Sequence, residues 1–126
     1  MNPFPTAPLV LARSRNSLLR GTTSVRALCA EAGKLGHRRI ALVDRDNLYG
    51  LWPFLAACRD EGLRPLVGAE ISDPREAETA VALVADATGY ANLCRLLTRR
   101  HRNPEFDLAA DLPRFAEGLR VLTASP

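Results

Sequence analysis

The sequence has no long hydrophobic run, and we expect no secretory signal. Its apolar stretches stay far below the roughly 20 residues that a membrane-spanning helix needs. The first residues do not combine a positively charged region with an apolar core, which a signal peptide requires. We therefore expect a cytoplasmic protein without a membrane partner.

Cysteine and histidine, the side chains that zinc sites use most, are scarce. Three cysteines, Cys29, Cys58 and Cys94, lie far apart among apolar residues. Their odd number and the lack of a Cys-x-x-Cys pair favour buried, reduced thiols over disulfides or a structural zinc site. The two histidines, His37 and His101, have no partner at ligand spacing.

Familiar nucleotide-binding and hydrolase motifs are also missing. The loop at residues 14–21 contains serine and glycine, but its spacing matches neither a Walker loop nor a dinucleotide fingerprint. No Gly-x-Ser-x-Gly elbow is present. These absences argue against the commonest nucleotide-binding and serine-hydrolase folds, although the loop could still cradle a phosphate.

Lysine is nearly absent, yet the chain is basic. Among 17 cationic side chains only Lys34 is a lysine, and the net charge is +3. Arginine suits phosphate because its planar fork engages two oxygens. An arginine-rich composition also results from a GC-rich genome, so the charge leaves nucleic-acid contact open. The basic run 99–102 is equally consistent with a nucleic-acid contact and with a solvated helix end.

Apolar and amphipathic segments alternate along the chain. Short apolar segments are typical of buried strands, and apolar residues three and four apart are typical of helices. Ser24 is a suitable N-cap, and Gly36 and Gly62 are suitable helix ends. The expected strands are 8–12, 39–43, 66–71, 81–85 and 120–124; the expected helices are 24–35, one from residue 51 to Gly62, and one that begins near Thr88.

This alternation predicts an α/β fold whose parallel strands are joined by right-handed crossovers. We expect one domain with about five mainly parallel strands and flanking helices. So few strands cannot close a barrel, so the sheet should stay open.

Candidate chemistry lies at the carboxyl ends of the strands, where parallel sheets collect their reactive groups. Asp44 follows the second expected strand, and Glu70 lies at the end of the third. The two carboxylates could share a magnesium or manganese ion. Alternatively, neighbouring arginines neutralise them. Thr79 comes just before the fourth strand, so we expect it at the opposite rim or in a loop that folds back.

Four motifs occur in a fixed order along the chain. They are Ser14-x-x-Ser-Leu-Leu-x-Gly21, Ala41-Leu-x-Asp-x-x-Asn-Leu-Tyr-Gly50, Pro65-Leu-x-Gly-x-Glu70 and Gly89-Tyr-x-Asn-Leu-Cys-x-Leu-Leu97. Their order and spacing resemble the polymerase-and-histidinol-phosphatase (PHP) domain at the N-terminus of the bacterial DNA polymerase III alpha subunit and its error-prone relative. The resemblance extends from about Leu9 to Ser125 and implies part of a distorted (β/α) barrel.

The resemblance also implies a site. PHP barrels bind a cluster of metal ions, often zinc or manganese, that can hydrolyse phosphoesters. Two of the ligand positions that can be placed in this sequence carry acidic residues, Asp44 and Glu70. The ligand positions that carry other residues are Leu11, Arg13, Arg20, Arg45 and Thr79.

Three arginines at these positions put fixed positive charge where metal would sit. We therefore predict no metal cofactor and no catalysis; zinc, manganese or magnesium would enter only if the site were functional. Burying a carboxylate without a partner costs free energy of folding. Without metal, Arg13 or Arg45 should therefore pair with the carboxylates of Asp44 and Glu70. The alternatives are a residual phosphoesterase that uses Asp44 and Glu70, and a phosphate- or DNA-binding module that uses Arg13, Arg15, Arg20 and Arg45.

Residues 1–126 are thus predicted to be a single, incomplete PHP-like domain. The resemblance implies a structural and protein-interaction role in DNA replication or repair, with any polymerisation in residues outside this chain. A part-barrel leaves an edge strand and an apolar face uncovered. We expect the remainder of a polymerase polypeptide, another subunit or a second copy of the chain to cover them.

Overall fold

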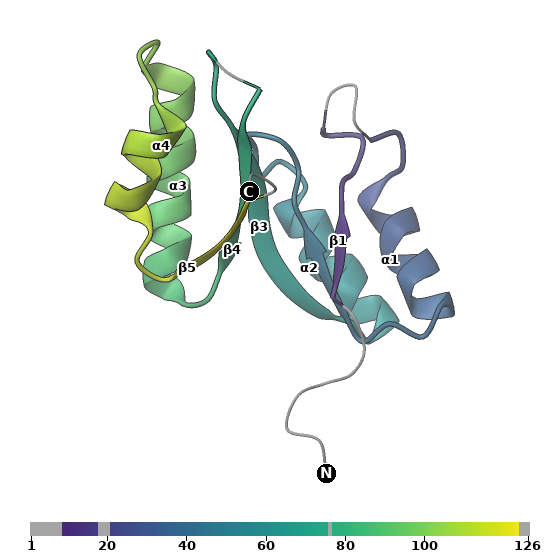
Figure 1. Cartoon of the computed structure of the whole chain (residues 1–126). Helices are drawn as coiled ribbons and strands as arrows, with labels where there is room; N and C mark the ends of the chain where they lie inside the picture. Colours follow the sequence, from purple (N-terminus) through teal and green to yellow (C-terminus); the bar gives the residue numbers. More distant parts are fainter. Residues whose placement is uncertain (1–8, 18–20, 76, 124–126) are drawn as a thin grey trace.

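The structure is a computed structural model that describes residues 9–17, 21–75 and 77–123. It contains a five-stranded sheet with helices packed against it (Figure 1). None of the described helices is long and apolar enough to cross a membrane. The strands are β1 (Val10–Ala12), β2 (Arg39–Leu42), β3 (Arg64–Ser72), β4 (Thr79–Val84) and β5 (Leu119–Thr123); the helices are α1 (Val25–Lys34), α2 (Leu51–Glu61), α3 (Ala87–Arg102), α4 (Leu108–Asp111) and the 3-10 helix η1 (Leu112–Phe115).

The helix ends follow local signals in the sequence. The Ser24 hydroxyl caps α1 and accepts a hydrogen bond from the Ala27 N–H at 3.2 Å. Gly62 ends α2 with a φ of 69°, a left-handed conformation that favours glycine. Pro53 falls in the first turn of α2, where its missing N–H would have no helical partner. The helices predicted over residues 24–35 and from residue 51 to Gly62 are therefore confirmed, as is the helix predicted to begin near Thr88.

The sheet has the strand order β1-β2-β3-β4-β5. The pairs β1–β2 and β2–β3 are parallel, whereas β4 is antiparallel to both of its neighbours. Every described strand except β4 therefore runs in one direction, in agreement with the predicted fold class. Residues 73–78 are too few for the crossover that a parallel pair needs, so β3 and β4 form a hairpin.

The hairpin changes the expected position of Thr79. In register, Thr79 lies opposite Ser72, the last residue of β3. It therefore lies at the same rim as the carboxyl end of β3, and the expectation of the opposite rim is wrong. The sequence pattern could not show this, because a buried strand of either direction is apolar on both sides.

The described helices all pack on one face of the sheet. Ile40 and Leu42 of β2 form a core with α1 and α2, while Ala69 and Ile71 of β3 form a second core with α3 and α4. Figure 1 shows these two helix groups on either side of β3. A third apolar cluster lies on the other face of the sheet and contains no residue of a described helix. It consists of Ala41, Val43 and Leu83, with Leu9, Leu66 and Val81 packed against them. We call this second face the open face.

α3 and β5 approach each other through two glycines. A Cβ at Gly89, in the first turn of α3, would lie 1.8 Å from the Gly118 carbonyl oxygen. Gly118 has a φ of 77°, and a Cβ there would lie 2.3 Å from the Gly89 nitrogen. No side chain fits at either position, so this contact sets how closely α3 can pack beside β5.

Asp111 fixes the position of the segment that follows α3. This buried carboxylate accepts hydrogen bonds from Arg99 Nε and from the Asp107 N–H, and Arg114 lies 3.6 Å away. Burial alone would raise the pKa of Asp111, but the Asp107 N–H and the charges of Arg99 and Arg114 outweigh it and hold that pKa below its ordinary value. The ionised side chain thus ties α4 to α3.

Two of the three cysteines lie buried between α1 and α2. The sulfur atoms of Cys29 and Cys58 are 3.8 Å apart and are not bonded to each other. Burial raises the pKa of Cys58 to about 12, which keeps the thiol protonated and unreactive. Buried free thiols are as predicted for this pair, whereas Cys94 is only partly buried.

Candidate functional site

Asp44 is held by the loop that follows β1. Its surface is 2% exposed. Its Oδ1 accepts hydrogen bonds from the Ser14 N–H at 2.7 Å and the Ser17 hydroxyl at 2.6 Å, and its Oδ2 accepts one from the Ser14 hydroxyl at 2.7 Å. Among the described residues, no arginine contacts this carboxylate. The expectation that Arg13 or Arg45 satisfies it is therefore wrong for Asp44.

Glu70, by contrast, has an arginine partner. Its side chain is 2% exposed, and its Oε2 lies 2.7 Å from both Nε and Nη2 of Arg13, which follows β1. The Arg13 side chain is 36% exposed, so the guanidinium stays partly solvated while two of its nitrogens hold one buried oxygen. The expected arginine counter-charge is confirmed for Glu70.

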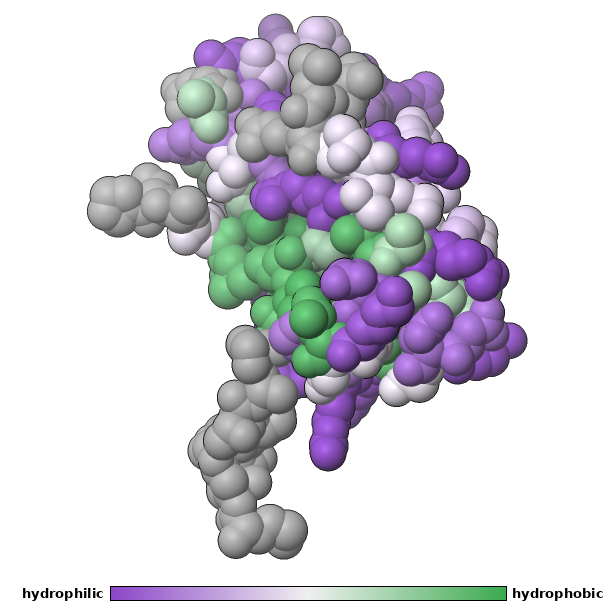
Figure 2. Space-filling view, turned by 90° about the vertical axis from the view of Figure 1, so that its right-hand side faces the viewer, coloured by the Kyte–Doolittle hydropathy of each residue, from purple (hydrophilic) through white to green (hydrophobic). Residues whose placement is uncertain are grey.

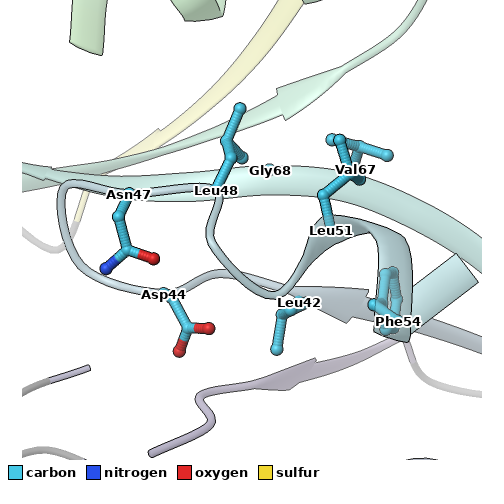
Figure 3. A pocket seen from close by; sticks show the side chains of 8 residues that line it. All are labelled: Leu42, Asp44, Asn47, Leu48, Leu51, Phe54, Val67 and Gly68. Atoms are coloured by element: carbon cyan, nitrogen blue, oxygen red, sulfur yellow. The ribbon is translucent and has the colours of Figure 1, made fainter. Parts of the chain in front are cut away.

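The two carboxylates point to opposite faces of the sheet. Arg45 pairs in register with Glu70, so these two residues share a face, and Asp44, the chain neighbour of Arg45, points to the other. Figure 3 shows the Asp44 and Leu42 side chains extending to the same side of the chain, and Leu42 belongs to the core under α1 and α2. The structure therefore does not bring Asp44 and Glu70 together around a shared ion.

The cavity beside Asp44 is too small for a substrate. It is closed mainly by apolar side chains from β2, α2 and β3 (Figure 3). Its volume is about 10 Å³, which is roughly the space that one water molecule requires. Asp44 is consequently a buried acceptor between a loop and the core, and it does not line a substrate cleft.

A second polar network, which the sequence analysis did not anticipate, fixes the loop after Asp44. Asp46 has a φ of 56°, a left-handed conformation that short polar side chains tolerate. Its carboxylate accepts hydrogen bonds from the Ser72 N–H at 2.8 Å and from the Ser72 hydroxyl. Arg100 donates to the Ser72 carbonyl at 2.6 Å, and His101 contacts the Asp46 carbonyl oxygen. The end of α3 thus braces the loop.

The predicted phosphate-binding arginines are not equivalent in the structure. Arg13 is paired with Glu70, and Arg45 Nε lies 3.9 Å from the Asp46 carboxylate. Arg15 is exposed. Within the basic run 99–102, Arg99 pairs with Asp111 and Arg100 donates to the Ser72 carbonyl, so these two residues are not simply a solvated helix end. A nucleic-acid contact by this run stays a prediction.

Two of the other predicted ligand positions, Leu11 and Thr79, lie within the described residues and offer no metal-binding atom comparable to histidine or a carboxylate. Leu11 is 39% exposed and precedes Arg13 by two residues, which places both on the open face. Thr79 lies two residues before Val81, the register partner of Glu70. Arg20 lies outside the described residues. Within the described ranges, no three His, Cys, Asp or Glu side chains gather closely enough to hold a metal ion.

These features define an α/β protein built as part of a (β/α) barrel, with polar groups at the carboxyl ends of its strands. The sequence profile of the PHP domain matches residues 12–125. The chain belongs to the PHP domain family.

Curated relatives include DNA polymerases. The chain is 38% identical over 92 residues to an error-prone DNA polymerase of Pseudomonas fluorescens, and the match covers 73% of this chain and 9% of that protein. It is 35% identical over 105 residues to an error-prone DNA polymerase of Anaeromyxobacter sp. strain K, and this match covers 80% of this chain and 9% of that protein. It is 35% identical over 85 residues to the DNA polymerase III subunit alpha of Bacillus subtilis, covering 64% and 8%. The chain therefore spans less than a tenth of these relatives.

Solved structures share the fold. A protein of Bifidobacterium adolescentis, described as a metal-dependent phosphoesterase, superposes with a TM-score of 0.56 at 24% identity, covering 90% of this chain and 45% of that one. An amidohydrolase of Chromobacterium violaceum, described with bound sulfate and no metal, gives a TM-score of 0.59 at 27% identity, covering 73% and 32%. The described sheet thus corresponds to part of a larger fold.

Replacing Arg13 with glutamine should lower the free energy of unfolding by about 1–3 kcal/mol, because Glu70 would keep a buried charge without its partner. Adding Glu70→Gln to Arg13→Gln should recover most of that loss, since a neutral amide needs no guanidinium. Urea unfolding of the wild type, both single variants and the double variant measures this coupling. Arg59→Gln, on the exposed side of α2, is the matched control. If the changes in unfolding free energy of Arg13→Gln and Glu70→Gln simply add in the double variant, the Arg13–Glu70 ion pair is contradicted.

Proposed function

We propose that this PHP domain is non-catalytic and has a structural and protein-interaction role in a DNA polymerase III alpha-type system, replicative or error-prone, in DNA replication or repair. The observation that carries the proposal is the Arg13–Glu70 ion pair, together with the serine-bound Asp44. Both acidic residues retained at ligand positions already receive donors from the chain itself. A metal ion would have to displace those donors before it could bind.

Hydrolysis of a phosphoester requires an activated water, which a metal or a general base supplies. The open face presents an arginine-bound Glu70, and the other face presents Asp44 beside a cavity of about 10 Å³. Their opposite orientation argues against the alternative, a residual phosphoesterase that uses both carboxylates.

The metal content of the purified chain tests the proposal. We expect clearly less than stoichiometric zinc or manganese by plasma mass spectrometry, and no hydrolysis of bis(p-nitrophenyl) phosphate when either ion is added. The variant L11H/R13H/R45H places imidazoles at three ligand positions and should take up more zinc than the wild type. The matched control L11Q/R13Q/R45Q removes the same charges without adding ligands. Stoichiometric metal in the wild type, with hydrolysis lost in Glu70→Gln, would overturn the proposal.

The open face supports the interaction part of the proposal. Leu11 and Leu122 are 39% and 49% exposed, and Leu122 is the register partner of Val81 in the cluster on that face. β1 and β5 form the two edges of the described sheet. Seen from the side that carries β1 and α1, a hydrophobic band is exposed between hydrophilic regions (Figure 2). We propose that the remainder of a polymerase polypeptide, or another subunit, covers this face.

Without such a partner, the chain should associate with itself through the open face. Light scattering at tens of micromolar should give a mass above the 13.7 kDa of one chain. Replacing Leu11 and Leu122 with glutamate should shift the mass towards the monomer, because charge on the apolar face opposes its burial. Leu35→Glu, at an exposed leucine that ends α1, is the control. A strictly monomeric wild type would count against a covered open face.

A further inference from the structure

Three arginines that the sequence analysis did not single out lie together at the rim opposite Glu70. Arg39 begins β2 and Arg64 begins β3, and the two are partners in the parallel register. Arg120, near the start of β5, reaches the same rim because β4 and β5 run antiparallel. All three line one hollow of about 470 Å³.

The charge of this hollow is not balanced from within the described chain. Arg39, Arg64 and Arg120 make no side-chain hydrogen bond or ion pair with any residue that the structure describes, and no acidic residue lines the hollow. Like charges on neighbouring strands repel each other. Arg13, by contrast, is paired with a carboxylate. Arg64 and Arg120 are exposed and Arg39 is half-buried. Three cations that converge on one hollow without a counter-charge among the described residues suit a negatively charged ligand.

We propose that this hollow binds a phosphate group, carried by a small phosphate compound or by a nucleic-acid strand. A guanidinium offers several N–H donors in a fixed fork, and a phosphate has enough oxygens to engage three such forks, whereas a carboxylate has two oxygens. Leu66 and Leu83 form apolar lining beside the arginines, which weakens solvent screening of the charges. Leu66 and Leu83 also belong to the cluster on the open face, so the hollow lies at one end of that face. The site goes beyond the proposed structural role, and it requires this end of the open face to stay accessible when a partner covers the rest. It lies at the rim opposite the one where Arg13 is engaged.

Calorimetric titration of the 126-residue chain with inorganic pyrophosphate, and separately with single-stranded oligothymidine, tests the site. Arg39→Gln and Arg64→Gln should each weaken pyrophosphate binding about tenfold, because each removes charge-assisted hydrogen bonds. Arg59→Gln removes the same charge from an exposed position on α2 and should leave binding unchanged. Circular dichroism should show all three variants folded. Arg39→Gln and Arg64→Gln each remove one of two adjacent like charges, and Arg59→Gln changes an exposed side chain.

The two probes distinguish the sources of phosphate. Oligothymidine binding that depends on Arg39 and Arg64 assigns the hollow to a nucleic-acid backbone, and pyrophosphate binding alone assigns it to a small phosphate compound. Either result supports the proposal. It is overturned if neither probe binds, if Arg59→Gln weakens binding as much as Arg64→Gln, or if hexaglutamate binds more tightly than both probes, which would indicate an acidic protein segment.

Discussion

A buried carboxylate must receive hydrogen bonds or an opposite charge, and the rim of this sheet is organised around that requirement. Glu70 lies in β3, the central strand, and Arg13 comes from the chain just after β1, a strand of three residues that pairs with β2. The Arg13–Glu70 ion pair therefore links an edge of the sheet to its centre across β2. Without it, a carboxylate with 2% of its side chain exposed would lose its ion-pair partner.

The same requirement shapes the other side of the rim. Asp44 faces the helices, and its three hydrogen bonds position the loop that connects β1 to α1. Asp46, Ser72 and Arg100 then tie the next loop to β3 and α3. Each acidic side chain at this rim is thus a point where two elements meet. Serine and arginine side chains join these elements in the described structure.

Much of the fold could be predicted from the sequence, because buried strands, helix caps and the PHP-like motifs are local. Ser24, Gly62 and the apolar strand at residues 39–43 illustrate this. The apolar pattern does not show the direction of β4, because an apolar strand looks the same in either direction. The short connection between the third and fourth strands does indicate a hairpin, and this signal was missed. The sequence narrowed the partner of Glu70 to Arg13 or Arg45, and the structure selects Arg13. The serine donors of Asp44 were not predicted.

The missed residues share one cause. Ser14, Ser17, Ser72 and Arg100 act through contacts between segments that lie about 25 to 30 positions apart, and no local pattern marks such pairs. The left-handed backbone conformation of Asp46 was also not predicted, although an aspartate followed by an asparagine in a loop is a recognised turn signal. The unbalanced hollow of Arg39, Arg64 and Arg120 became visible only once the register of β2, β3 and β5 was known.

The central claim, that the chain's own donors occupy the place of a metal, is tested most directly by metal linkage to stability. A metal that binds the folded chain raises its free energy of unfolding as the ion concentration exceeds the dissociation constant. We predict the same urea midpoint in chelator, in zinc and in manganese. A midpoint that rises steadily with the logarithm of the concentration of either ion, and that no longer rises in Glu70→Gln, would contradict the claim.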